Sequence, residues 1–256
     1  MRNPDRQTTF RFRQFEVSNS RAGMKVGTDA VLLAAWALTD AGAVHEPRTI
    51  VDAGTGTGVI ALLMAQRFPG ARITAAEISA EACTEAAANF AASPWNNRIT
   101  LVPEDFSLYA RSPEMPGRVD LLISNPPFFV NGAGAPDPDR SLSRMAGSLS
   151  PLSLVEQSAA MLSQHGRLCM ISTAERAVAD GIRFRAAMHR LTVERLTEVT
   201  TGEGKPPRRL LWQIRRQPEP GERCDTLYDR LTIRTAAGNP TPEYRRLVEP
   251  YYLVVK

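Results

Sequence analysis

The chain has 256 residues, of which 43% are hydrophobic and 23% charged, the composition of an ordinary globular protein. No apolar run approaches the roughly 20 residues that a membrane-spanning helix needs, which argues against a membrane partner. Residues 1–13 are polar and hold arginines without an apolar signal core, and the three cysteines are odd in number and widely spaced. We therefore expect a cytoplasmic protein with reduced thiols and no metal site.

The net charge of +4 is distributed unevenly along the chain. It is +4 in residues 1–27, −6 in residues 28–175 and +6 in residues 176–256. An acidic middle flanked by basic ends suggests a polyanionic substrate whose phosphates contact the two ends. A solvated surface that is rich in arginine is the simpler alternative.

Strand and helix signals alternate through the middle of the chain. The expected strands are 49–51, 73–76, 99–102, 119–123 and 168–171, and the expected helices are 59–67, 79–92, 152–162 and 176–190. Strands separated by helices of this length predict an α/β fold with a mainly parallel sheet that is covered on both faces. Four later strands, at 191–199, 210–214, 231–234 and 251–255, predict an antiparallel C-terminal edge on that sheet.

The turn after the first of these strands, Asp52-Ala53-Gly54-Thr55-Gly56-Thr57-Gly58, is rich in glycine. Its glycines let the backbone turn tightly and approach a ligand at the carboxyl end of a strand, where open α/β sheets bind cofactors. A nicotinamide-binding turn is the natural competitor, but Val59 stands where the third glycine of G-x-G-x-x-G belongs. Asp52 would also repel a pyrophosphate, whereas it can help to hold a cationic amino-acid group.

Acidic residues follow the next two strands. Glu77 is placed to accept from both hydroxyls of a ribose, and Asp105 to accept from an adenine amine. Each residue alone is more often a surface or helix-capping carboxylate. At successive strand ends the functional interpretation is favoured, and ribose, adenine and amino acid together describe S-adenosylmethionine.

Asn125-Pro126-Pro127-Phe128 follows the strand at 119–123 and is the most informative segment of the chain. The Asn125 side-chain oxygen and the Pro126 carbonyl can accept from the two hydrogens of a planar NH2 group, while Phe128 stacks on the ring. Holding the amine in this way draws its nitrogen toward tetrahedral geometry without a strong base. A simple turn is the alternative. The Gly-, Ala- and Pro-rich residues 131–147 that follow predict a lid.

These motifs resemble those of class I, Rossmann-like methyltransferases that act on amino groups. Phe10–Phe15, Met24-Lys25-Val26-Gly27-Thr28-Asp29 and Ser93-Pro94-Trp95 resemble, more narrowly, the bacterial tRNA adenine-N6 methyltransferases that modify valine tRNA beside the anticodon. The resemblance implies methyl transfer to N6 of an adenosine, at position 37, with S-adenosylmethionine as the cofactor. It also implies that the basic C-terminal strands belong to the same domain as the catalytic core. We expect an N-terminal strand and helix segment (1–47) packed on a methyltransferase domain (48–256), in a single globular domain overall.

Three groups of site residues follow from the motifs and the resemblance. The catalytic group is Asn125, Pro126 and Phe128. The cofactor-binding group is Lys25, Gly27, Thr28, Asp52, Gly54, Gly56, Gly58, Glu77, Asp105, Phe106 and Asn125, with Lys25–Thr28 implied to close over the methionine end. The tRNA-binding group is Arg11, Arg13, Arg140, Arg144, Lys205, Arg208 and Arg209.

Other activities remain open at this point. A glutamine-N5 methyltransferase acting on release factors shares the pocket, but such enzymes carry a helical N-terminal domain. A guanine-N2 methyltransferase of ribosomal RNA is not excluded by the pocket, and a non-catalytic nucleotide- or RNA-binding module is the alternative of a different class. In Phe10–Arg13 we expect the aromatics to pack inward and the arginines to face outward, and we expect Trp95 to be a packing residue. No sequence feature defines the oligomeric state, and a monomer is assumed.

Overall fold

The computed structural model describes residues 9–19, 26–39, 46–127, 149–217 and 225–255. Its strands are β1 (Thr9–Arg11), β2 (Glu16–Ser18), β3 (Thr49–Ala53), β4 (Arg72–Ala76), β5 (Ile99–Val102), β6 (Val119–Ser124), β7 (Leu162–Thr173), β8 (Leu191–Thr200), β9 (Arg209–Arg216) and β10 (Leu227–Thr232). Its helices are α1 (Thr28–Trp36), α2 (Val59–Arg67), α3 (Ala80–Ala91), α4 (Phe106–Ala110), α6 (Pro151–Met161), α7 (Arg176–Met188) and α8 (Pro242–Val248).

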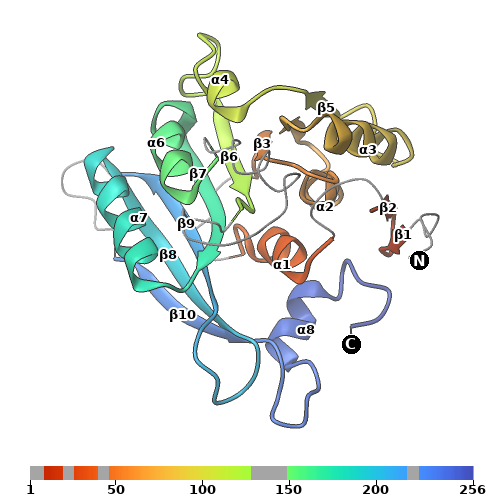
Figure 1. Ribbon diagram of the computed structural model, residues 1–256, viewed down its shortest axis with the longest axis vertical. Helices are drawn as coiled ribbons and strands as arrows, with labels where there is room; N and C mark the ends of the chain where they lie inside the picture. The colour runs from red at the N-terminus through yellow and green to blue at the C-terminus, as the bar shows by residue number, and fades with distance from the viewer. Residues whose placement is uncertain (1–8, 20–25, 40–45, 128–148, 218–224, 256) are drawn as a thin grey trace, which may run out of the picture.

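Eight strands form one mixed sheet in the order β10-β8-β9-β7-β6-β3-β4-β5 (Figure 1). All neighbouring pairs are parallel except those of β9, which runs antiparallel to both β7 and β8. The α/β fold with a mainly parallel sheet is therefore confirmed. The expected antiparallel edge is confirmed for β9 but is wrong for the edge strand itself, since β10 pairs parallel with β8. The reason is that β10 crosses over the β8–β9 hairpin and joins the free side of β8.

Helices cover both faces of this sheet (Figure 1). On one face α1, α2, α3 and α8 pack over side chains such as Ile50, Ile73 and Ile123. On the other face α4, α6 and α7 pack over Val51, Leu122 and neighbouring side chains. Consecutive β3 and β6 residues thus alternate between two cores, which is why both strands are nearly continuous apolar runs. None of the helices in the described ranges is both long and apolar enough to cross a bilayer.

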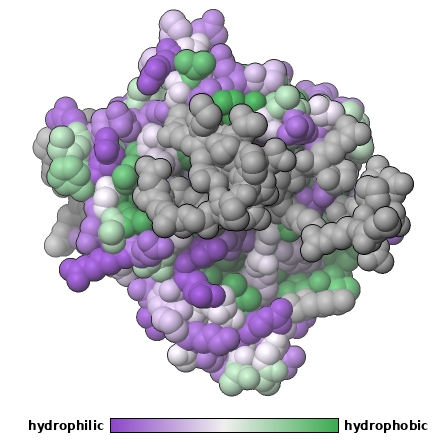
Figure 2. Space-filling view, in the orientation of Figure 1, coloured by the Kyte–Doolittle hydropathy of each residue, from purple (hydrophilic) through white to green (hydrophobic). Residues whose placement is uncertain are grey.

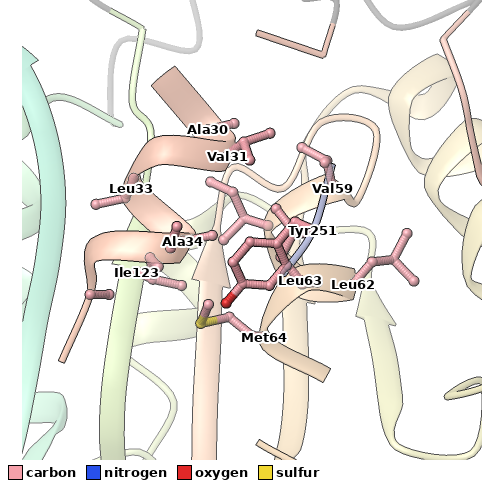
Figure 3. Close-up of a cluster of buried hydrophobic side chains, with 14 of the residues drawn as sticks. Ala30, Val31, Leu33, Ala34, Val59, Leu62, Leu63, Met64, Ile123 and Tyr251 are labelled. Atoms are coloured by element: carbon pink, nitrogen blue, oxygen red, sulfur yellow. The ribbon is translucent and has the colours of Figure 1, made fainter. Parts of the chain in front are cut away.

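The α1 helix is held against α2 by apolar packing and by one arginine. Figure 3 shows side chains of both helices meeting around the ring of Tyr251. Arg67, the last residue of α2, donates from Nη1 to the carbonyls of Ala34 (3.1 Å), Ala35 (3.2 Å) and Ala37 (2.5 Å) at the end of α1. These carbonyls have no partner within the helix, so a cation at this end satisfies them and interacts favourably with the helix dipole.

The β1–β2 hairpin packs on the C-terminal segment. Phe12 is 3% exposed and stacks between Phe15 (ring centroids 4.5 Å apart) and Tyr252 (5.9 Å). The inward orientation expected for Phe12 is confirmed, and Phe10 packs on the same cluster, against Phe12 (4.8 Å) and Tyr252 (5.9 Å), but remains 36% exposed at its rim. Trp95 is a packing residue, as expected, and meets Phe15 edge-on at 5.5 Å.

The last part of the chain differs most from the sequence expectations. The strand expected at 251–255 is wrong: Tyr252 makes only an isolated bridge to Phe12. Tyr251 is buried and Tyr252 packs against the same core, whereas Leu253 and Val254 are exposed. The strand expected at 231–234 lies earlier, as β10, and α8 was not foreseen. Figure 2 shows that hydrophilic residues dominate the described surface on this view, with apolar residues in separate patches.

Candidate active site

The motifs singled out in the sequence meet at the carboxyl ends of β3, β4 and β6. In the register of the sheet, Ala53 lies opposite Ala76 on β4 and Asp52 opposite Ile123 on β6. The fully buried Ser124 hydroxyl donates to the Ala53 carbonyl at 2.7 Å. This bond joins the strand that leads into the glycine turn to the strand that leads into Asn125, so the two motifs share one rigid edge.

The glycine turn is held in place by the neighbouring strand. The backbone N–H groups of Gly54 and Thr55 both donate to the Ala76 carbonyl, at 2.9 and 3.0 Å. Gly54, Gly56 and Gly58 have φ values of +70°, +57° and +83°, a conformation that other residues rarely adopt. A Cβ on Gly56 would point into open space, whereas one on Gly58 would lie 2.4 Å from Cε1 of Phe90. Gly58 is therefore required by packing, and Gly56 leaves room for a ligand.

The Glu77 carboxylate lies against this turn. Its Oε2 accepts from the Gly56 N–H at 2.9 Å, and its Oε1 accepts from the N–H groups of Ile78 and Ser79, each at 2.9 Å. A carboxylate offers about four acceptor sites, and three are used here. In this arrangement Glu77 can take one further hydroxyl, so accepting from both ribose hydroxyls, as the sequence suggests, requires the Gly56 bond to open.

Asp52 is a fully buried carboxylate with one unused oxygen. Its Oδ2 accepts from the Thr55 hydroxyl (2.5 Å) and the Ala61 N–H (3.1 Å), whereas Oδ1 is buried without a partner among the described residues. Burial raises the pKa of Asp52 to about 7, against the opposing effect of the Thr55 and Ala61 hydrogen bonds; the negative charge of Glu77 adds to the rise. A cationic group beside Oδ1 would offset the desolvation, which fits the ammonium of an amino-acid ligand.

Asn125 presents the second unused oxygen. Its Oδ1 is buried and accepts no hydrogen bond from the described part of the chain, although the residue as a whole is partly exposed. The following Pro126 is buried and Pro127 half-buried, and neither has an N–H to donate. An orphaned acceptor is costly unless something else satisfies it, so this oxygen fits a bound N–H donor. Phe128, expected to stack on the ring, lies outside the described residues.

Asp105 and Phe106 lie three to four residues beyond the end of β5. Asp105 is the N-cap of α4 and accepts from the Ser107 N–H at 2.7 Å. Phe106 is 4% exposed and packs in the core beneath α4. The capping role explains why an acidic residue stands there, and it leaves the expected contact of Asp105 and Phe106 with an adenine as a proposal.

The N-terminus of α1 approaches the same edge from another direction. Gly27, the N-cap, and Thr28 are exposed, while Lys25 lies outside the described residues. The next residue, Asp29, accepts from Arg209 Nε at 2.8 Å. The ion pair links the start of α1 to the start of β9.

Arg209, which is expected to bind tRNA, also donates to the Arg208 carbonyl (3.1 Å), and its contact with RNA stays a prediction. Lys205 and Arg208 are exposed on the β8–β9 turn and form no ion pair with a described residue. Arg11 faces outward as expected but pairs with Glu16 at 3.0 Å. The outward Arg13 donates to the Tyr252 carbonyl at 2.8 Å.

The remaining expected elements lie outside the described residues. These are Arg140, Arg144 and the lid at 131–147.

A buried connection behind the glycine turn has no signal in the sequence. Asn89 on α3, 4% exposed, donates from Nδ2 to the carbonyls of Thr57 (2.8 Å) and Ser18 (3.1 Å) and accepts from the Ser18 N–H (2.8 Å). Through these hydrogen bonds Asn89 connects the end of the N-terminal hairpin to the glycine turn. Leu149 was not predicted either, although its side chain lies over Gly54. One asparagine in an alanine-rich helix gives no pattern from which such a contact is predicted.

Comparisons with known proteins agree with this geometry. The model of the methyltransferase small domain family matches residues 20–193. A tRNA1(Val) (adenine(37)-N6)-methyltransferase from Porphyromonas gingivalis is 42% identical over 95% of this chain and 94% of its own. One of the same name from Bacteroides thetaiotaomicron is 37% identical over 96% and 98%. Among solved structures, a predicted O-methyltransferase from Agrobacterium tumefaciens matches with a TM-score of 0.65 and 22% identity over 87% of this chain and 96% of that one, which bears on the fold alone.

Proposed function

The chain belongs to the methyltransferase small domain family and, within it, to the bacterial tRNA1(Val) (adenine(37)-N6)-methyltransferases, and from this we propose how its site works. The protein is a tRNA methyltransferase that uses S-adenosylmethionine and methylates N6 of an adenosine. We place the target at position 37 of valine tRNA, as in the names of its relatives, and the protein in the cytoplasm.

The observation that carries the proposal is the orphaned Oδ1 of Asn125 at the carboxyl end of β6. We propose that it accepts one hydrogen of the adenine N6 amine while the Pro126 carbonyl accepts the other, with Phe128 against the ring. The two acceptors draw the lone pair out of conjugation and toward the methyl group. Because Ser124 is tied to β3, the amine is held at a fixed height above the edge of the sheet, which favours an in-line approach.

The glycine turn and its acidic neighbours fit the cofactor. The bound cofactor supplies a methyl group on a positively charged sulfur. Gly56 leaves space beside the turn, Glu77 has one acceptor site left for a ribose hydroxyl, and the buried Oδ1 of Asp52 fits the ammonium of the methionine end. We propose that Asp105 and Phe106 hold the adenine, and that Lys25, Gly27 and Thr28 close over the methionine end.

The acceptor nitrogen gains a methyl group and loses one proton in the reaction. The ammonium formed on an aromatic ring is strongly acidic, so water or the same acceptors can take that proton, and no residue is assigned as a general base. Away from the reacting groups, we propose that cationic side chains contact the phosphates of the tRNA. These are the exposed Arg11, Arg13, Lys205 and Arg208, together with Arg140 and Arg144. Residues 1–47 and 48–256 act as one catalytic unit in this proposal, since α1 packs directly on α2.

The test is methylation of unmodified tRNA with labelled S-adenosylmethionine, followed by digestion to nucleosides. The proposed function predicts label in N6-methyladenosine, and a tRNA whose position 37 is guanosine serves as the control that stays unlabelled. Label in N2-methylguanosine would replace adenine by guanine as the target. Absence of cofactor binding in a calorimetric titration would contradict the whole proposal.

A further inference from the structure

A pocket lies on the opposite side of the sheet from the helix α1, beside the carboxyl ends of β7 and β8. Its volume is about 410 Å³, within the range of roughly 300–1,000 Å³ that is usual for small-molecule sites. It is lined by Ala174, Ala179, Arg183, Leu196, Glu198, Pro206, Pro207 and Leu210. None of these residues belongs to the site described above.

The walls of this pocket suit a flat ring. Pro206 and Pro207 come from the β8–β9 turn, and Leu196 and Leu210 come from the sheet, so the turn and the sheet both contribute apolar side chains to the lining. Pyrrolidine rings and leucine side chains are apolar surfaces against which a base that has left its stack can bury one face. Prolines also hold the turn in a limited set of backbone conformations, which keeps the wall in place.

Two charged groups give the pocket a polar pattern. Arg230 donates from Nε (3.2 Å) and Nη2 (2.6 Å) to Oε2 of Glu198 alone, which leaves Glu198 Oε1 without a hydrogen bond from the described residues. Arg183 lies over the Trp212 ring, 5.5 Å from its centroid, and its one ion pair with a described residue is a long contact of 3.5 Å with Asp180. A free carboxylate oxygen accepts from an exocyclic amine or ring N–H, and a guanidinium donates to a ring nitrogen or carbonyl.

The position of the pocket relates it to the methylated adenine. The order β8-β9-β7-β6 places β9 two strands and β8 three strands from the one that carries Asn125. At about 4.8 Å a strand, this is a separation of roughly 10–15 Å along the same edge of the sheet. A nucleic-acid strand covers that distance in about three to four stacked nucleotides, and in fewer where the bases are splayed apart. The exposed Lys205 and Arg208 flank the two prolines, where they can contact the phosphates of such a strand.

We propose, building on the proposed function, that this pocket receives an unstacked nucleobase of the same tRNA, a few nucleotides from the adenosine that is methylated. The base packs between the prolines and the leucines, Glu198 Oε1 accepts from its amino or imino hydrogen, and Arg183 donates to its acceptor edge. The pocket thereby makes the enzyme select the sequence around its target. A single base with an amino group beside a ring acceptor, such as N6–H2 and N7 of adenine or N4–H2 and N3 of cytosine, satisfies both charged groups.

The experiment combines variants of the pocket with tRNA substrates that lack a single base. Ala174→Phe fills the half-buried mouth, Glu198→Gln removes the carboxylate at constant shape, and Ala177→Phe adds the same ring at an exposed position of α7 outside the pocket. Each is assayed for kcat/KM on full-length valine tRNA and on the same tRNA with one abasic residue at each of four positions on either side of the target. Cofactor affinity is measured by calorimetry in parallel.

We expect one abasic position to lower kcat/KM of the wild-type protein by about 10- to 100-fold. Ala174→Phe and Glu198→Gln should lose a comparable factor on intact tRNA and should then be insensitive to that abasic residue, with unchanged cofactor affinity. Ala177→Phe should behave as wild type. The proposal would be overturned if each abasic residue lowered kcat/KM by the same factor in the variants as in the wild type. This would also be the result if the pocket bound a protein partner. If the wild-type protein methylates no tRNA at all, the proposed function fails before the pocket is tested.

Discussion

The N–H of Gly56 donates a 2.9 Å hydrogen bond to Oε2 of Glu77, so the glycine turn after β3 and the acidic residue after β4 are joined directly. The bond fixes the turn, and it also occupies an acceptor site that a ribose would use. Glu77 therefore has a structural role and a proposed binding role in the same place.

Replacing Glu77 should lower the affinity for the cofactor more than it lowers the stability of the fold. Glu77→Ala removes three acceptor bonds and the proposed ribose contact, and we expect cofactor affinity to fall by about 10- to 100-fold. Glu77→Gln keeps one acceptor oxygen and should lose less. Titration calorimetry measures both, with Glu81→Ala, an exposed residue in the first turn of α3, as the control that should bind normally. Wild-type affinity in Glu77→Ala would remove this residue from the site.

Two glycines of the turn, Gly56 and Gly58, should respond differently to alanine. Gly56→Ala meets no neighbour, so its cost to stability should be limited to backbone strain of about 1–2 kcal/mol, while the methyl group enters the open space and abolishes cofactor binding. Gly58→Ala drives a Cβ into Phe90 and should destabilise the fold by about 2–4 kcal/mol.

Chemical denaturation and calorimetry separate these effects. Gly117→Ala, with φ of +71° and no neighbour within 4 Å, carries the same strain far from the turn and should bind the cofactor normally. If Gly56→Ala bound the cofactor as tightly as Gly117→Ala, the space beside Gly56 would not be the cofactor site.

The sequence was informative where one residue type does one physical task. The glycine turn, the alternation of strands and helices and the Asn-Pro-Pro segment were all predicted, because backbone strain, apolar periodicity and missing N–H groups are local properties. Contacts between distant segments were not predicted. Asn89 reaches Thr57 and Ser18 only after the chain folds, and Arg209 is engaged by Asp29, which lies 180 residues earlier.

The buried Asp52 should make stability depend on pH. Its pKa is raised in the folded protein, so the folded state favours the protonated form, and this stabilisation is complete below about pH 4 and is lost as the pH rises to about 7. The loss amounts to at most a few kcal/mol. Asp52→Asn keeps an acceptor for Thr55 and Ala61 and should remove this component.

Melting temperatures from pH 4 to pH 8 test this. The stability of the wild type relative to Asp52→Asn should fall through this range and level off above about pH 7. A constant difference between the two proteins would show that the Asp52 pKa is not raised. The variant should also bind the cofactor more weakly, since an amide cannot offset the charge of the ammonium.

The Asp29–Arg209 ion pair should support cofactor binding by holding the start of α1 in place. The Asp29 side chain is 29% exposed and that of Arg209 31%. Loss of the ion pair should therefore lower the stability by only about 0.5–1 kcal/mol. Because Gly27 and Thr28 directly precede Asp29, we expect Asp29→Asn and Arg209→Gln to weaken cofactor binding by about 3- to 10-fold. The double variant should be no worse than either single one.

The Arg185–Glu156 pair (2.9 Å) on α6 and α7 provides the control. Breaking it should cost a similar, small amount of stability and leave cofactor binding unchanged. Additive losses in the double variant of Asp29 and Arg209 would contradict the coupling.

Single-turnover methyl transfer to unmodified valine tRNA by Asn125→Ala at saturating cofactor tests whether the orphaned oxygen of Asn125 holds the amine that is methylated. We predict that the variant binds S-adenosylmethionine as the wild type does and that its rate falls by about 10²- to 10³-fold, while Asn125→Asp, which keeps an acceptor oxygen, retains part of the rate. A wild-type rate in Asn125→Ala would show that the Asn125 oxygen does not hold the amine and that another group activates it.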